Sequence, residues 1–123
     1  MLVVDDEEDL LEVLQAELTD AGYDVAVARD AKEAFDRWAC AQFDVVLTDL
    51  KMPGMNGLEM VTRMLRAEPR LGAVLMTGFA SEEVRETLRV WGHRQLAKPF
   101  DADEMLDALR DELAAPWVGA WTR

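Results

Sequence analysis

Residues 44–57 read DVVLTDLKMPGMNG: an apolar run, an aspartate at position 49, and then a loop rich in proline and glycine. The run is continuously apolar rather than alternating, which is typical of a parallel strand that is covered on both faces. The loop is a shaped turn rather than the start of a helix. The stretch therefore predicts a buried strand over residues 44–48 with Asp49 at its carboxyl end.

The same alternation of short apolar runs and helical patterns continues along the chain. Strands are predicted at Leu2–Val4, Val25–Ala28, Asp44–Thr48, Ala73–Met76 and Arg94–Ala97. Helical faces are predicted from Leu10, Leu11, Leu14 and Leu18; Phe35 and Trp38; Leu58, Val61 and Leu65; Val84, Leu88 and Trp91; and Met105, Leu106, Leu109 and Leu113. Five such strand–helix units predict an α/β fold, a doubly wound five-stranded parallel sheet with five helices.

Length and charge limit the classes of protein to which the chain can belong. Its 123 residues suit one domain, predicted over 1–114, with 115–123 as a C-terminal tail or the start of a linker. Only four residues precede Asp5, which is short for a strand and favours a chain that once began earlier. A net charge of −12 argues against direct nucleic acid binding and favours a cation or a basic protein as partner.

Cysteine usage and hydropathy indicate the compartment. Cys40 is the only cysteine, so no internal disulfide forms; we expect a packed thiol and a reducing, cytoplasmic location. No signal peptide or membrane-spanning run is visible. The single histidine, His93, has no Ser or Cys partner in a catalytic pattern, so we expect a loop residue without a catalytic role. The tryptophans near the C-terminus leave a homodimer contact open.

Chemically active side chains follow four of the predicted strands. Asp5 and Asp6 follow the first strand, Asp49 the third, Thr77 the fourth and Lys98 the fifth. Because ligands bind at the carboxyl ends of parallel strands, these residues are expected to converge on one pocket. A carboxylate can act as a nucleophile toward phosphorus, and clustered carboxylates favour a divalent cation such as Mg²⁺. The set therefore predicts a phosphoryl-transfer site.

Together, these motifs resemble the receiver domain of bacterial two-component response regulators, over roughly residues 2–113. The motifs are VVDDE at 3–7, DLKMPGMNG at 49–57, MTG at 76–78 and KPF at 98–100. The resemblance implies a flavodoxin-like strand order, 2-1-3-4-5. It also implies a phosphoacceptor that assists its own phosphotransfer and dephosphorylation, rather than an enzyme with separate substrates.

The resemblance further assigns roles to individual residues. Asp49 would accept a phosphoryl group from a sensor histidine kinase or a phosphotransfer protein. Asp6, Asp49 and the Lys51 backbone carbonyl would hold Mg²⁺ (or Mn²⁺), with Asp5 acting through water. Thr77 would be the switch hydroxyl and Lys98 the phosphate-binding lysine, before a cis bond to Pro99.

One departure and two alternatives remain. Gln95 stands where receivers usually carry an aromatic residue, so we expect it to stay exposed, with Phe79 relaying the signal instead. An aspartate-nucleophile phosphohydrolase would usually have an acid two residues after the nucleophile, where this chain has Lys51. A receiver-like interaction module that is never phosphorylated is the other alternative.

Overall fold

Five parallel strands form one sheet in the order β2-β1-β3-β4-β5. The computed structural model describes residues 1–78, 86 and 93–114. The strands are β1 (Leu2–Val4), β2 (Ala26–Ala28), β3 (Val45–Asp49), β4 (Gly72–Thr77) and β5 (Arg94–Ala97). The predicted strands agree with these bounds to within one residue at each end, and the flavodoxin-like strand order is confirmed.

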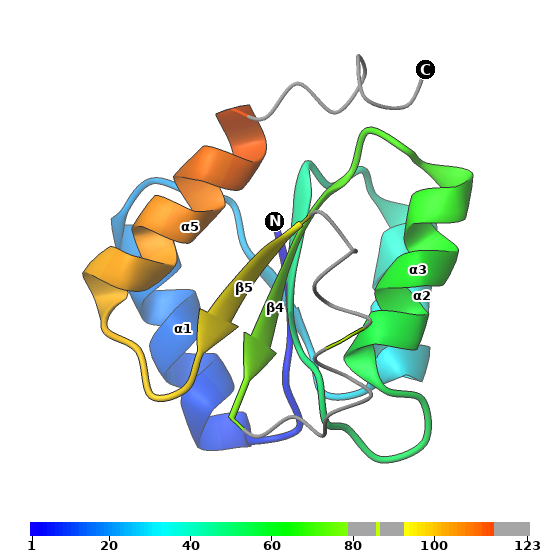
Figure 1. Ribbon diagram of the computed structural model, residues 1–123, viewed down its shortest axis with the longest axis horizontal. Coiled ribbons are helices and arrows are strands. Elements are labelled where there is room, and N and C mark those ends of the chain that lie inside the picture. Colours follow the sequence, from blue (N-terminus) through cyan, green and yellow to red (C-terminus); the bar gives the residue numbers. More distant parts are fainter. Residues whose placement is uncertain (79–85, 87–92, 115–123) are drawn as a thin grey trace.

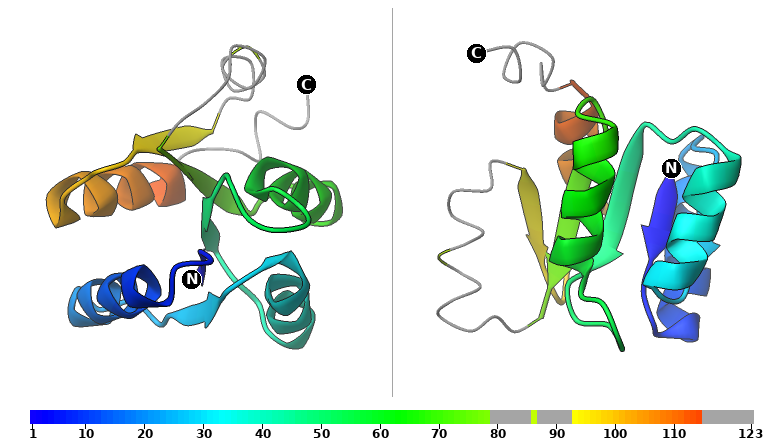
Figure 2. Two further views of the ribbon diagram at one scale, coloured as in Figure 1. Left: turned by 90° about the horizontal axis from the view of Figure 1, so that it is seen from below. Right: turned by 90° about the vertical axis from the view of Figure 1, so that its right-hand side faces the viewer.

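Helices cover both faces of the sheet (Figures 1 and 2). They are α1 (Glu8–Asp20), α2 (Ala31–Cys40), α3 (Gly57–Ala67) and α5 (Ala102–Ala114). α1 and α5 lie on one face, and α2 and α3 lie on the other, as the view from below shows most clearly (Figure 2). Each pair of helices closes over its own apolar core, with β1 and β3 contributing to both cores.

Local sequence signals explain where these helices begin and end. The Asp30 side chain accepts a hydrogen bond from the Glu33 amide at the start of α2, and Asn56 caps α3 in the same way. Gly22 follows α1 with a positive φ of 101°, a conformation that glycine adopts without steric cost. The Asn56 cap fixes where the loop that follows Asp49 ends.

The residues that mark the predicted fourth helix, Val84, Leu88 and Trp91, lie outside the described residues. So do Phe79 and the predicted tail at 115–123. Among the described helices, none combines the length and the apolar character that a membrane span requires.

The predicted face of the last helix is partly wrong. Leu113 was expected inside but is 41% exposed, whereas the neighbouring Glu112 is 1% exposed. Met105, Leu109 and Glu112 follow an i, i+4, i+7 spacing, which brings them to one face of α5. A carboxylate can occupy this buried position because its Oε2 atom accepts a hydrogen bond of 2.8 Å from the Ala73 amide.

His93 lies in the bend before β5, as predicted, but its side chain is not an ordinary surface group. It is buried, and its Nδ1 atom lies 2.5 Å from Oε2 of Glu112. The sequence pattern gave no sign of this partner, because the two residues belong to different elements. His93 and Glu112 thus link the start of β5 to the end of α5.

The expectation of a packed thiol at Cys40 is wrong, because this residue is exposed at the end of α2. Cys40 follows Trp38 by two residues, which places it roughly 200° around the helix from that side chain. Trp38 and Phe35 pack against the core with their rings edge to face, 6.4 Å apart. The helix therefore turns its aromatic side inward and Cys40 outward.

Candidate phosphoryl-transfer site

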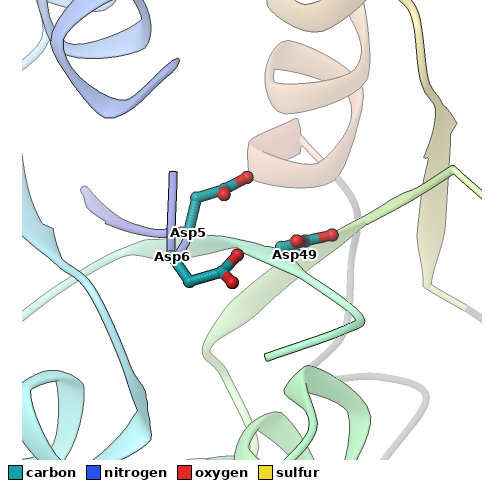
Figure 3. Close-up of side chains that lie close together, drawn as sticks. All are labelled: Asp5, Asp6 and Asp49. Carbon is teal, nitrogen blue, oxygen red and sulfur yellow. The ribbon is translucent and has the colours of Figure 1, made fainter. Parts of the chain in front are cut away.

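Three carboxylates lie together at the carboxyl ends of β1 and β3 (Figure 3). Asp5 and Asp6 follow β1, and Asp49 is the last residue of β3. The two strands are neighbours, although β2 comes between them in the sequence. The chain thus reverses its direction of strand addition between β1 and β3, and such switch points form ligand crevices in open α/β sheets.

The next two strands bring Thr77 and Lys98 to the same edge of the sheet. Thr77 ends β4 and pairs in register with Ala97 of β5. The Lys98 amide donates a hydrogen bond of 2.8 Å to the Thr77 carbonyl. The Lys98–Pro99 peptide bond is cis, as expected. The backbone of Lys98 is therefore fixed to Thr77 by a hydrogen bond, and its side chain extends from there toward the carboxylates.

The Lys98 ammonium group reaches two of the three carboxylates. Its Nζ atom lies 3.0 Å from Oδ2 of Asp5 and 3.4 Å from Oδ1 of Asp49. The predicted proximity of Lys98 to Asp49 is confirmed, although the shorter contact is with Asp5. The other oxygen of Asp5 accepts a hydrogen bond from the Glu7 amide. Asp5 is therefore already engaged by two donors.

Burial and charge alter the proton affinities of this site. Burial of Asp49, together with the neighbouring charge of Asp5, raises the pKa of Asp49, and Lys98 offsets this only in part. Burial works against the charged form of Lys98, but the hydrogen bond to Asp5 and the charge of Asp49 raise the pKa of Lys98. Lys98 therefore stays cationic, whereas burial and the charge of Asp5 disfavour the ionised form of Asp49.

The donor set fits a hard divalent cation. One oxygen from each of Asp5, Asp6 and Asp49 lies within 4.8 Å of the others. Asp6 is exposed, whereas Asp5 and Asp49 are buried, so the group opens to solvent on the Asp6 side. Carboxylates, a backbone carbonyl and water are the ligands that Mg²⁺ prefers. Lys51, whose carbonyl the family resemblance adds to this set, is an exposed residue of the loop after β3.

Comparison with known proteins identifies the family. The sequence model of the response regulator receiver domain matches residues 1–110. This chain belongs to the response regulator receiver family. The receiver is 31% identical over 114 residues to sporulation initiation phosphotransferase F of Bacillus subtilis, covering 92% of each chain. It is 34% identical to the regulatory protein AtoC of Escherichia coli over 106 residues, which make up 85% of this chain.

The relatives differ in length. The receiver spans 23% of AtoC and 50% of the uncharacterized transcriptional regulatory protein YkoG of Bacillus subtilis, to which it is 32% identical. Receiver domains are thus found both as nearly whole proteins and as parts of longer ones. They are signalling domains rather than classical enzymes.

Solved structures agree with this assignment. The signal receiver domain of an HD domain-containing protein from Pseudomonas fluorescens Pf-5 superposes with a TM-score of 0.84 at 32% identity, covering 91% of both chains. The response regulator protein TrrA from Thermotoga maritima, in complex with Mg²⁺-BeF, gives a TM-score of 0.78 at 31% identity, covering 89% of this receiver and 95% of TrrA.

All five predicted side chains lie at the expected edge of the sheet. Gln95 is exposed, as expected, while Phe79 lies outside the described residues. The sequence interpretation assigned no role to Thr48, which is fully buried and donates to the Asp49 carbonyl. The available signal was a hydroxyl in an otherwise apolar run, directly before Asp49.

Proposed function

We propose that this receiver is a phosphorylation-dependent signalling switch in which Asp49 is the phosphoacceptor. One observation carries the proposal: the Asp49 carboxylate lies within 4.8 Å of Asp5 and Asp6 and within 3.4 Å of the Lys98 ammonium group. A nucleophile, a cation-binding pair of acids and a fixed positive charge are the parts that phosphoryl transfer requires.

In the proposed reaction, an Asp49 oxygen attacks the phosphorus atom of a phosphohistidine. A P–O bond forms, the P–N bond breaks, and its electron pair stays on the imidazole nitrogen of the donor. The donor is a sensor histidine kinase or a phosphotransfer protein. Hydrolysis of the resulting acyl phosphate returns the receiver to its starting state.

Asp6, Asp49 and the Lys51 carbonyl would hold Mg²⁺ or Mn²⁺, with Asp5 acting through water. The ion would neutralise charge on the phosphoryl oxygens. Lys98 would bind a phosphoryl oxygen as a compact point charge, and the Thr77 hydroxyl would donate to another. Phosphorylation would thereby draw Thr77 and Lys98, which are already joined through their backbones at 2.8 Å, toward Asp49.

We assign this role to residues 1–114 and place it in the cytoplasm, with no direct contact to nucleic acid or membrane. The net charge of −12 supports the first of these exclusions. The family match, which ends at residue 110, supports the domain boundary.

Labelling with a small acyl phosphate tests the assignment of Asp49. The receiver is incubated with acetyl phosphate and Mg²⁺, and its intact mass is measured with and without the metal. We expect one labile, Mg²⁺-dependent phosphoryl group, absent from Asp49→Asn. Asp44→Asn is the matched control, because Asp44 immediately precedes the opposite end of the same strand.

Equal labelling of Asp49→Asn and the parent would refute the assignment. A parent protein that never labels would favour an interaction module that works without phosphorylation. Turnover of a small phosphate ester would instead favour a phosphohydrolase.

A further inference from the structure

The main chain just after Asp49 is held by three hydrogen bonds. The Leu50 amide donates to the Met76 carbonyl at 3.0 Å, and the Leu50 carbonyl accepts from the Gly57 amide at 2.8 Å. The Asp49 carbonyl accepts from the Thr48 hydroxyl at 3.0 Å. The first two bonds come from β4 and α3. The third comes from a side chain, so a single substitution can remove it.

Thr48 is the residue of β3 that supplies this side chain. Val46 belongs to the core under α2 and α3, and Thr48 points to the same face because side chains on a strand alternate. Thr48 is 0% exposed. A buried hydroxyl without a partner destabilises a protein, so its bond to the Asp49 carbonyl satisfies both groups.

Gly57 closes in on the same carbonyl at the start of α3. A Cβ atom added to Gly57 would lie 2.0 Å from the Asp49 carbonyl oxygen and 3.1 Å from the Thr48 hydroxyl oxygen. Real Cβ atoms do not approach other atoms as closely as the first of these distances, so α3 can begin here only with a glycine. The Asp49 carbonyl oxygen is therefore in contact with the Thr48 hydroxyl and close to the backbone of Gly57.

We propose that Thr48 is a positioning residue for phosphoryl transfer to Asp49. By holding the Asp49 carbonyl, its hydroxyl fixes the peptide plane that joins the nucleophile to Leu50. That plane sets the direction of the Asp49 carboxylate and the path of the chain to Lys51. The inference rests on the proposed function, because it assumes that Asp49 accepts the phosphoryl group.

Small errors in the placement of a reacting group have large effects on rate. Thr48 faces α2 and α3, whereas Asp49 points toward the other face of β3. Thr48 therefore touches neither the phosphoryl group nor the metal, and it acts only through the backbone of its neighbour. This separation allows the hydroxyl to be removed while all five site side chains stay in place.

The test compares Thr48→Val, which keeps the shape of the side chain without its hydroxyl, with Thr48→Ser, which keeps the hydroxyl. Thr62→Val is the matched control, because the Thr62 hydroxyl donates to the Leu58 carbonyl at 2.7 Å within α3, outside the site. For each protein we would measure the rate of labelling by acetyl phosphate at saturating Mg²⁺, together with the melting temperature. Thr48→Ala provides a second variant without the hydroxyl, should the valine variant fold poorly.

We expect Thr48→Val to label roughly three- to tenfold more slowly than the parent, the effect of losing about one hydrogen bond. Thr48→Ser and Thr62→Val should label at nearly the parental rate. Parental labelling of Thr48→Val would overturn this inference alone, because its hydroxyl would then be merely structural. Slow labelling of Thr48→Ser would overturn it as well, by pointing to the methyl group. A parent protein without label would overturn the proposed function and this inference with it.

Discussion

Replacing Glu112 with leucine should remove a large part of the stability of this receiver, because the change leaves two buried polar groups without their carboxylate. Glu112 is 1% exposed on α5. Its Oε2 atom accepts the Ala73 amide at 2.8 Å and lies 2.5 Å from Nδ1 of His93. Leucine fills a similar volume but accepts no hydrogen bond.

The magnitude follows from these two contacts. A buried amide that loses its acceptor costs about 1–3 kcal/mol. The buried His93 ring nitrogen that loses its hydrogen-bonding partner adds a cost of about the same size. A loss of about 3 kcal/mol is a large share of the 5–15 kcal/mol that is typical of a domain. For a chain of this length it should lower Tm by about 10 °C.

Urea denaturation and thermal melting measure this loss directly. Asp111→Leu is the matched control, because Asp111 is the preceding residue of the same helix but is exposed. Its free energy of unfolding should change by no more than about 0.5 kcal/mol. Glu112→Gln should lose less than Glu112→Leu, because its amide oxygen can still accept the Ala73 amide.

Free energies of unfolding of Glu112→Leu and Asp111→Leu that agree within about 0.5 kcal/mol would refute a stabilising role for the Glu112 carboxylate. Labelling gives an independent check. Ala73 lies near the start of β4, whereas Thr77 lies at its carboxyl end. Below its melting temperature, Glu112→Leu should therefore label with acetyl phosphate at the parental rate.

Two further predictions concern the acidic site. Millimolar Mg²⁺ should raise the Tm of the parent protein, because the ion binds the native state. This rise in Tm should vanish in Asp6→Asn but persist in the control variant Asp9→Asn. An equal rise in all three proteins would indicate that Mg²⁺ only screens the net charge. Burial raises the pKa of Asp49 above its ordinary value of 3.8, so the native state favours the protonated carboxyl group. The Asp49 carboxyl therefore contributes to the stability of the native state at pH values below 3.8, and this stability is lost as the pH rises through the higher folded-state pKa. In EDTA, Asp49→Asn should thus gain stability relative to the parent as the pH rises above the ordinary carboxyl pKa of 3.8, as measured by urea denaturation. A difference in stability that does not change with pH would contradict the assigned cause.

The positions of the strands and of the site residues could be read from the sequence because both depend on short-range patterns. A continuous apolar run such as residues 45–47 marks a strand covered on both faces. The residue that ends such a run lies at the edge of the sheet where ligands bind. The pattern therefore predicts that Asp5, Asp49 and Lys98 lie near one another, as they do in the folded protein.

The contacts within the site could not be read in the same way. The sequence placed Lys98 beside Asp49, but in the folded protein its ammonium group lies closer to Asp5. That preference depends on how the side chain crosses from β5 to β1 and on which oxygens are already engaged. The Thr48–Asp49 bond is similarly set by the direction in which one carbonyl points.

The sequence by itself determined the class of fold, the strand order through the family it resembles, and the set of residues that we propose for the site. Only the tertiary structure decided that Glu112, rather than Leu113, is buried on α5. Both residues flank the apolar stripe of the helix, so helical periodicity cannot choose between them, and hydrophobicity favours the wrong one. The choice depends on the Ala73 amide, 39 residues away, and on His93 in the bend before β5. These partners offset the cost of burying a carboxylate, and only the folded chain brings them together.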